Sequence, residues 1–169
     1  NLRPSITLLP EMTEILSILK QDIRPRLRPT SETGTLGERL AAEYLEANGY
    51  RLVLSNFKVP IGRNTRGVAV TGEIDIVALE GDVLCFVEVK TKASRDFAAP
   101  IAAVNLRKQR QITRTARIYR RIFRLQEMQY RYDVVSVVRK QDRPAEIELI
   151  KGFWSESKFR RKAWSGDIY

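Results

Sequence analysis

Residues 72–90 read GEIDIVALEGDVLCFVEVK, two runs rich in Val, Ile, Leu and Phe on either side of Glu80-Gly81-Asp82. Short β-rich runs joined by a glycine-containing turn are typical of a β-hairpin. The sequence therefore predicts strands at residues 73–79 and 83–91.

The predicted hairpin carries two carboxylates among apolar residues. A two-residue turn at Gly81-Asp82 places Asp75 directly opposite Glu88, and a turn at Glu80-Gly81 leaves the two diagonal on one face. Only a three-residue turn without a bulge separates them. Like charges that face each other across a sheet are destabilising, so a bound cation is one explanation for this pair.

This carboxylate pair suits Mg²⁺, which binds through one or two carboxylates and keeps several waters for a substrate. The Val89 carbonyl can add a ligand, and Glu38 can add a third carboxylate if its helix packs over this face. Lys90, on the same face as Glu88, can orient or deprotonate a water or stabilise phosphate charge. The alternative is a solvated sheet face, with Lys90 paired to Glu73.

Composition narrows the chemistry further. The 169 residues include 30 Lys and Arg, 20 Asp and Glu, no His and one Cys, for a net charge of +10. Hydrolases with a histidine base, His-ligated metals, thiolate-held zinc or iron–sulfur sites and disulfide frameworks are excluded. Cys85 alternates onto the face opposite Glu88 and is predicted to be a core residue. A pI near 10 favours a polyanionic partner, nucleic acid before an anionic membrane.

The chain divides into three zones. Residues 1–33 form an extension with an amphipathic helix (Met12, Ile15, Leu16, Leu19, Ile23) and a linker; residues 151–169 form a tail that mixes aromatic and basic side chains. The tail aromatics either stack on bases or, more often, anchor a terminus to the core. Residues 34–150 have the predicted order α-β-β-β-α-β-β, which favours an α/β domain with a mixed sheet. Its predicted elements are a helix that Asn48-Gly49 ends, strands at 51–59, 73–79 and 83–91, a loop at 60–71, a helix at 100–123, and strands at 132–138 and 146–150.

The second predicted helix carries a stripe of arginines. Their spacing of 3, 4, 3, 4, 3 places them on one helical face, and no acidic residue lies between Asp96 and Glu127. Such a stripe predicts contacts to phosphates, the alternative being a solvated face or a protein contact. Lys108 lies near the apolar border of this helix and either reaches a phosphate or is an ordinary surface lysine. The predicted nucleic-acid-binding residues are Arg107, Lys108, Arg110, Arg114, Arg117, Arg121 and Arg124, with Arg63 and Arg66 from the 60–71 loop as weaker candidates.

An ordered set of motifs resembles a known family. The set comprises Gly37-Glu38, Ala41-Ala42, Tyr44-Leu45, Gly49-Tyr50, Asn56-Phe57, Gly72-Glu73-Ile74-Asp75, Phe86-Val87-Glu88-Val89-Lys90, Lys108 and Tyr132-Asp133-Val134-Val135. Between residues 34 and 150 the chain resembles the YraN-like proteins, bacterial relatives of archaeal Holliday-junction resolvases. The longer 60–71 loop and the N-terminal extension depart from that pattern.

The resemblance implies the restriction-endonuclease-like fold of PD-(D/E)xK nucleases, a mixed sheet flanked by helices. It implies Mg²⁺-dependent phosphodiester hydrolysis, with Asp75, Glu88 and Lys90 in catalytic positions and Glu38 as the helix-borne acid. Branched or junction DNA as substrate, Mn²⁺ as a substitute metal and a homodimer are expectations by analogy. The alternatives are a nuclease-fold module that binds nucleic acid without cutting it, acting in assembly or targeting, and a protein-interaction domain. The lone cysteine and the lack of a membrane segment or signal pattern predict a cytoplasmic protein with no membrane partner.

Overall fold

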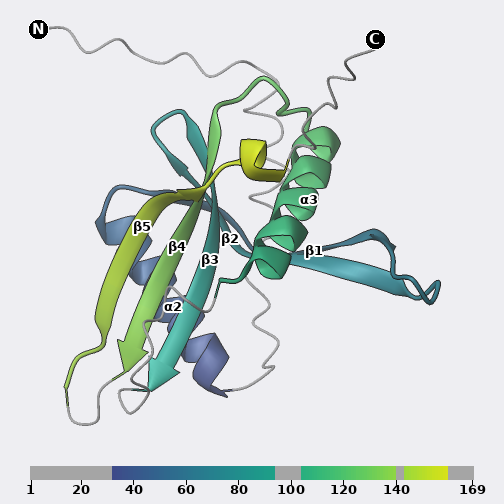
Figure 1. Ribbon diagram of the computed structural model, residues 1–169. Helices are drawn as coiled ribbons and strands as arrows, with labels where there is room; N and C mark the ends of the chain where they lie inside the picture. Colours follow the sequence, from purple (N-terminus) through teal and green to yellow (C-terminus); the bar gives the residue numbers. More distant parts are fainter. Residues whose placement is uncertain (1–31, 94–103, 140–142, 160–169) are drawn as a thin grey trace, which may run out of the picture.

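The computed structural model describes residues 32–93, 104–139 and 143–159 (Figure 1). The predicted helix around Met12–Ile23 and the tail beyond Phe159 lie outside the described residues. The chain has the predicted α-β-β-β-α-β-β order, which confirms the fold class. In chain order the elements are α2 (Glu32–Ala47), β1 (Arg51–Arg63), β2 (Ala69–Glu80), β3 (Val83–Ala93), α3 (Leu106–Ile122), β4 (Tyr130–Arg139), β5 (Glu146–Trp154) and the 3₁₀ turn η2 (Glu156–Phe159).

The sheet is mixed. Its five strands lie in the order β1-β2-β3-β4-β5, and every neighbouring pair is antiparallel except β3 and β4, which are parallel. Parallel neighbours need a crossover connection, and α3 provides it between β3 and β4. A mixed sheet with a helix on each side is consistent with a nuclease-like core.

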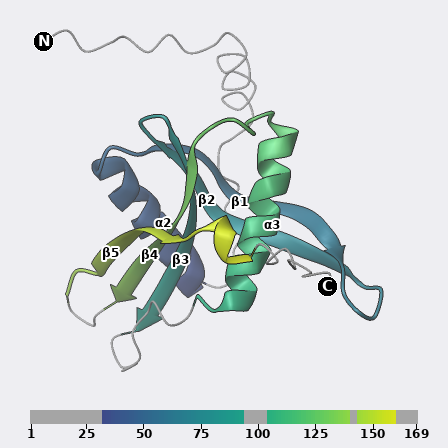
Figure 2. The same ribbon diagram turned by 45° about the horizontal axis from the view of Figure 1, so that its top comes forward.

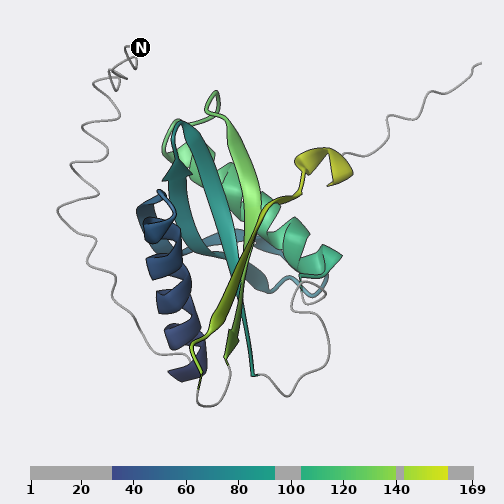
Figure 3. The ribbon, with the colours of Figure 1, turned by 90° about the vertical axis from the view of Figure 1, so that its left-hand side faces the viewer.

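Helices α2 and α3 cover opposite faces of the sheet (Figure 3). Strand side chains alternate between faces, so each strand contributes to two separate cores. The core under α2 contains Ala41, Leu45, Tyr50, Ile76, Ala78, Cys85, Val87, Val89, Val135 and Val137. The core under α3 includes Phe86, Ile112, Ala116, Tyr119, Tyr132, Val134 and Trp154. Cys85 is fully buried, as predicted, and burial raises its thiol pKa to about 12.

A glycine lets α2 approach β3 closely. A Cβ built on Gly37 would lie 1.8 Å from the Oγ1 of Thr91, so only glycine fits at this contact. At its other end, α2 stops as predicted, because Gly49 adopts a φ of +84° and the N–H of Tyr50 donates to the carbonyl of Leu45 (3.0 Å).

The prediction of a loop at residues 60–71 is wrong. Strand β1 continues to Arg63 and β2 begins at Ala69, with Pro60 paired to Thr71 and Arg63 paired to Ala69. A bulge between Pro60 and Gly62 accommodates residues that do not alternate in polarity, which is why the pattern read as a loop. The resulting long hairpin extends past α3 (Figure 2).

Helix α3 begins at Leu106, later than the predicted start at Pro100, which lies outside the described residues. Asn105 caps the helix, its side chain accepting a hydrogen bond from the backbone N–H of Lys108 (3.0 Å). The helix ends at Ile122, and Arg124 has a φ of +53°. None of the described helices is long and apolar enough to cross a bilayer.

Strand β5 continues to Trp154, beyond the predicted end at Ile150. Trp154 is 5% exposed, its ring stacks on Tyr132 with centroids 4.8 Å apart, and its Nε1 donates to Thr113 (3.0 Å). This tail aromatic therefore anchors the end of the sheet to α3, the commoner of the two readings for such residues.

Candidate functional site

The β2–β3 turn decides where the two carboxylates lie. Glu80 pairs with Val83 across Gly81-Asp82, which is the predicted two-residue turn, and the paired section runs on to Ile76 and Val87. Asp75 and Glu88 follow directly at the end of that section. This is the turn from which the sequence predicts Asp75 opposite Glu88, and the strand pairing ends one position before the two carboxylates.

Glu88 is a buried carboxylate held by two lysines. It is 1% exposed, and its Oε1 lies 2.6 Å from the Nζ of Lys90. Its Oε2 lies 3.1 Å from the Nζ of Lys108, close enough for an ion pair, yet this oxygen has no partner with hydrogen-bond geometry. The solvated-face alternative is therefore wrong, and Glu73 is paired with Lys58 (3.0 Å) instead of Lys90.

Asp75 lies in a setting that opposes its ionisation. Its Oδ2 accepts a hydrogen bond from the backbone N–H of Val89 (2.8 Å), which fixes the carboxylate beside β3. Burial, followed by the charge of Glu88, raises the pKa of Asp75 to about 7. Burial acts to lower the pKa of Lys108, but the charges of Glu88 and Asp75 outweigh it, so that pKa is raised. Two nearby carboxylates thus share the positive charge of the lysines.

Glu38 is held by Asn56 and, in the part of the chain that the structure describes, is not part of a cluster of three carboxylates. Helix α2 covers the opposite face of the sheet, and Glu38 accepts a hydrogen bond from the side chain of Asn56 (3.2 Å). Its charge is only a minor cause of the raised pKa of Asp75. No three His, Cys, Asp or Glu side chains among the described residues lie close enough together to hold a metal ion. Glu38 therefore does not complete a three-carboxylate cluster.

The remaining groups still fit a hydrated divalent cation. Mg²⁺ is bound by one or two carboxylates and retains several waters, so Asp75, Glu88 and the Val89 carbonyl are a sufficient protein share. The Oε2 of Glu88, buried and without a hydrogen bond, is an oxygen that such a cation would satisfy.

Two features of this site differ from what the sequence predicted. Lys108, predicted to contact nucleic acid, reaches the carboxylates because the Asn105 cap sets it on the first turn of α3. Asn56, which holds Glu38, was not proposed as a site residue; its φ of +55°, unusual for any residue but glycine, was not visible in the sequence.

The predicted arginine stripe is mostly present. Five of its six members are exposed along α3: Arg107, Arg110, Arg114, Arg117 and Arg121. Arg124 lies beyond the helix end and leaves the stripe. Arg117 forms an ion pair with Glu156 of η2 (2.9 Å), an acidic partner that is distant in sequence, and Arg110 lies over the ring of Phe159 (5.7 Å). The local sequence indicated a stripe without acidic partners. The fold supplies one, because Glu156 pairs with Arg117.

The two hairpin arginines lie apart from the carboxylates, toward the tip of the long β1–β2 hairpin. Arg63 donates to the carbonyl of Gly67 (2.7 Å), and Arg66 is exposed in the turn. Neither one contacts a described residue of the carboxylate site.

A small α/β domain with a buried carboxylate–lysine site and a basic helix is the class that this fold and geometry define. Residues 37–137 match the model of the uncharacterised protein family UPF0102. The chain belongs to this family, the YraN family that its motifs resemble.

Relatives cover most of the described chain. A UPF0102 protein of Syntrophus aciditrophicus is 39% identical over 126 residues, 75% of this chain and 91% of that protein. One of Acetivibrio thermocellus is 41% identical over 122 residues, 70% of this chain and 87% of that protein. Among solved structures, the crystal structure of SSO0001 is 16% identical with a TM-score of 0.33, covering 87% of this chain and 61% of that one.

Proposed function

We propose that this protein is a Mg²⁺-dependent endonuclease that hydrolyses phosphodiester bonds in DNA. The observation that carries this proposal is the arrangement of Asp75 and Glu88 at the end of the paired β2–β3 section, with Lys90 and Lys108 beside them. Acids and lysines at one buried position are the groups that such a reaction needs in a chain without histidine.

Asp75, Glu88 and the Val89 carbonyl would hold Mg²⁺, and Mn²⁺ would substitute for it. Glu38, hydrogen-bonded to Asn56, would act on them through its charge. A cation bound there supplies Lewis acidity toward a phosphate and lowers the pKa of bound water.

The lysines serve the substrate once it enters. An ammonium group has three N–H donors, so Lys90 and Lys108 can each contact Glu88 and still donate to a phosphate oxygen. Lys90 lies 2.6 Å from Glu88 and is the group best placed to orient a water or stabilise charge that develops on the phosphate.

The exposed arginines of α3 would hold the DNA backbone, since their contacts with phosphates are independent of sequence. Junction or branched DNA as the preferred substrate, and a homodimer as the active form, rest on the family resemblance alone.

A second candidate function is a module that binds nucleic acid but does not cut it. It is favoured by the double neutralisation of Glu88, because two lysines make the buried charge tolerable without a metal.

Cleavage of branched and linear DNA in Mg²⁺ or Mn²⁺ tests the first function. We expect Glu88→Gln and Lys90→Ala to abolish cleavage, and Glu73→Gln, a change on the same hairpin at a residue paired with Lys58, to retain it. Activity that survives in both site variants would exclude this site as the catalytic centre.

Thermal melts separate the two candidates. Mn²⁺ should raise the melting temperature of the unaltered protein and of Glu73→Gln, but not that of Asp75→Asn. DNA binding without any metal response or cleavage would instead establish the second function.

A further inference from the structure

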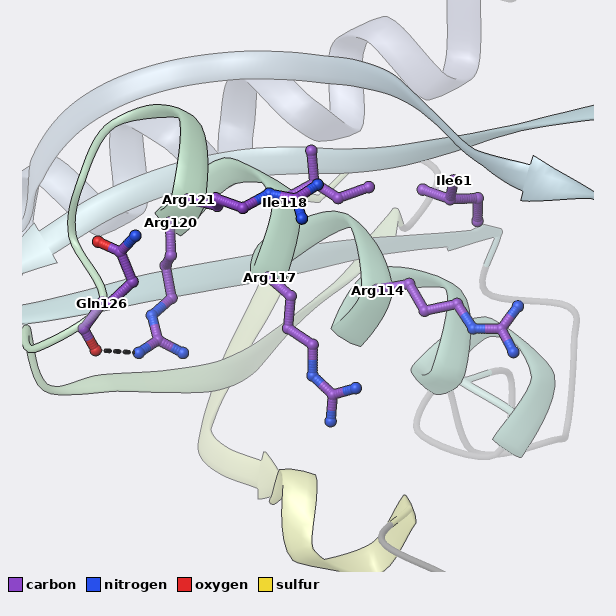
Figure 4. Close-up of a pocket in the computed structure, with 7 residues that line it drawn as sticks. All are labelled: Ile61, Arg114, Arg117, Ile118, Arg120, Arg121 and Gln126. Atoms are coloured by element: carbon purple, nitrogen blue, oxygen red, sulfur yellow. Dashed lines mark hydrogen bonds between the residues drawn. The ribbon is translucent and has the colours of Figure 1, made fainter.

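A hollow of about 550 Å³ lies on α3, away from the carboxylates. Its wall consists of side chains from α3, β1 and the turn after the helix: Ile61, Arg114, Arg117, Ile118, Arg120, Arg121 and Gln126. Figure 4 shows the four arginines projecting from α3 in different directions, with Arg120 turned toward Gln126 and Arg114 away from it. Within the described part of the chain no acidic residue lines the hollow, so its lining is positively charged.

Two of the four guanidinium groups are already held in place. Arg117 is bound by Glu156 (2.9 Å). Arg120 donates to the carbonyls of Leu125 (3.3 Å) and Gln126, with its guanidinium 3.8 Å from the centre of the Tyr130 ring. The neutral partners of Arg120 leave its charge available and reduce the side-chain entropy that a ligand would otherwise have to overcome, whereas the charge of Arg117 is offset by Glu156.

The other two guanidinium groups are available to a ligand. Arg114 and Arg121 are exposed and form no ion pair with any residue in the described part of the chain. An arginine carries its donors in a planar fork that matches two oxygens of a phosphate. The hollow therefore combines one arginine held by neutral groups, Arg120, with two exposed phosphate-binding groups, Arg114 and Arg121.

We propose that this hollow binds a sugar–phosphate unit of a nucleic-acid strand, at a phosphate other than the one that is cleaved. Its volume lies within the range of small-ligand pockets and exceeds what a bare phosphate needs. Ile61 and Ile118 supply apolar surface for a sugar between the charged groups.

The position of the hollow on α3 sets its distance from the carboxylates. At about 1.5 Å of rise per residue, Arg114 and Arg121 lie about 9 and 20 Å along the helix from Lys108. Phosphates in one strand of a duplex repeat about every 3.4 Å along the axis, so a duplex lying along α3 would place the bound phosphate about three to six nucleotides from the carboxylate site. This spacing rests on the proposed function; the anion site itself does not.

A nucleic acid is favoured over an acidic protein because Lys108 and the hollow lie on one helix. A strand presents phosphates at regular intervals and can engage both at once. Arg110, the one stripe arginine between them in sequence, extends the same positive surface.

The most direct test replaces one side-chain amide of the hollow, that of Gln126, by a carboxylate. Gln126→Glu is nearly isosteric and adds a carboxylate to its wall, whereas Gln129→Glu adds the same charge at an exposed residue that does not line it. Binding of a labelled duplex in EDTA, followed by fluorescence anisotropy, should weaken about tenfold for Gln126→Glu and stay within about twofold for Gln129→Glu. Equal effects of the two variants would overturn the proposal.

Salt dependence gives a second readout. The double variant Arg114→Gln/Arg121→Gln should lower the slope of log Kd against log salt by about 2, since each lost phosphate contact removes about 0.9. A control that removes two exposed arginines elsewhere, Arg39→Gln/Arg51→Gln, should leave the slope unchanged. An unchanged slope in the first double variant, or displacement of the duplex by polyglutamate at equal charge, would also overturn the proposal.

A duplex shortened one base pair at a time tests the spacing. The effect of Gln126→Glu should disappear once the strand no longer reaches the hollow; an effect that persists in the shortest duplexes that still bind would overturn the spacing. These binding measurements need no metal and no cleavage. Failure of the nuclease proposal therefore leaves their result intact, and a negative result here leaves the cleavage test standing.

Discussion

The Nζ of Lys108 on α3 lies 3.1 Å from the Oε2 of Glu88 on β3. This ion pair ties the arginine-bearing helix to the carboxylate site, so any change in the position of α3 is transmitted to Glu88. Because Glu88 is 1% exposed, its charge depends on these contacts and not on water.

Removing the Lys108 ammonium should destabilise the metal-free protein. Lys108→Met keeps an unbranched side chain as far as the ε position but leaves the buried Glu88 with Lys90 alone, a loss that we estimate at about 2 kcal/mol. Urea unfolding in EDTA measures it. Lys58→Met, which removes an exposed partner of Glu73, should cost less than about 0.5 kcal/mol.

A double variant separates charge from packing. Lys108→Met/Glu88→Gln removes both charges, so it should recover most of the stability that Lys108→Met loses. If the stability changes of Lys108→Met and Glu88→Gln simply add in the double variant, the Lys108–Glu88 ion pair contributes little. The link between α3 and β3 then consists of packing.

The raised pKa of Asp75 predicts an unusual pH dependence. Its pKa is raised from 3.8 to about 7, so the folded state holds the proton more tightly than the unfolded chain. Ionising Asp75 therefore lowers stability progressively as the pH rises from about 4 to about 7, and below about 4 the effect is absent. Asp75→Asn, which can still accept from the Val89 N–H, should be more stable than the parent above about pH 7.

Comparing Asp75→Asn with the parent protein separates the titration of Asp75 from that of the other carboxylates. Urea titrations in EDTA across this pH range should show a stability difference that grows with pH and levels off near neutrality. A difference that is constant with pH would mean that Asp75 titrates normally.

The hairpin was predictable because its signals are local. The turn at Gly81-Asp82 and the alternation of apolar residues fix which residues share a face, so the Asp75–Glu88 pair followed from the sequence. Alternation along the strand also placed Cys85 correctly in the core. The metal, the DNA and the reaction remain predictions.

The features that were missed depend on contacts between distant segments. Glu156 neutralises Arg117 across the fold, and the extension of β1 to Arg63 is set by pairing with β2. Glu38 was expected over the carboxylates, yet α2 packs on the opposite face. Which face a helix covers is decided by the whole sheet, and the spacing of residues within that helix carries no such information.

Glu156 should weaken DNA binding, because it neutralises Arg117. It accepts hydrogen bonds from Tyr132 (2.7 Å) and Arg117 (2.9 Å); burial opposes its ionisation, but these partners outweigh burial and the pKa of Glu156 is lowered. Glu156→Gln releases the charge of Arg117, so the salt slope of duplex binding should steepen by about 0.9. Glu127→Gln, which alters an exposed acid, is the control. Equal slopes in the two variants would remove Arg117 from the DNA contact.

The contact between Gly37 and Thr91 makes a prediction whose sign opposes helix propensity. In an ordinary helix interior, Gly→Ala stabilises by about 1 kcal/mol. Here the added Cβ would lie 1.8 Å from the Oγ1 of Thr91, so Gly37→Ala should push α2 away from β3 and destabilise the protein by about 2 kcal/mol. Urea unfolding gives the value.

Shortening Thr91, the residue that faces Gly37, should offset the destabilisation caused by Gly37→Ala. Thr91→Ala removes the Oγ1 and Cγ2 atoms that the new Cβ would meet, so Gly37→Ala/Thr91→Ala should be more stable than Gly37→Ala alone. Because Glu38 follows Gly37 on the same helix, Gly37→Ala should also disturb the Glu38–Asn56 hydrogen bond and weaken any Mn²⁺ stabilisation, and the double variant should restore it. If Gly37→Ala alone stabilises the protein, α2 does not lie in close contact with β3 at Thr91, and the Glu38–Asn56 hydrogen bond loses its support from that contact.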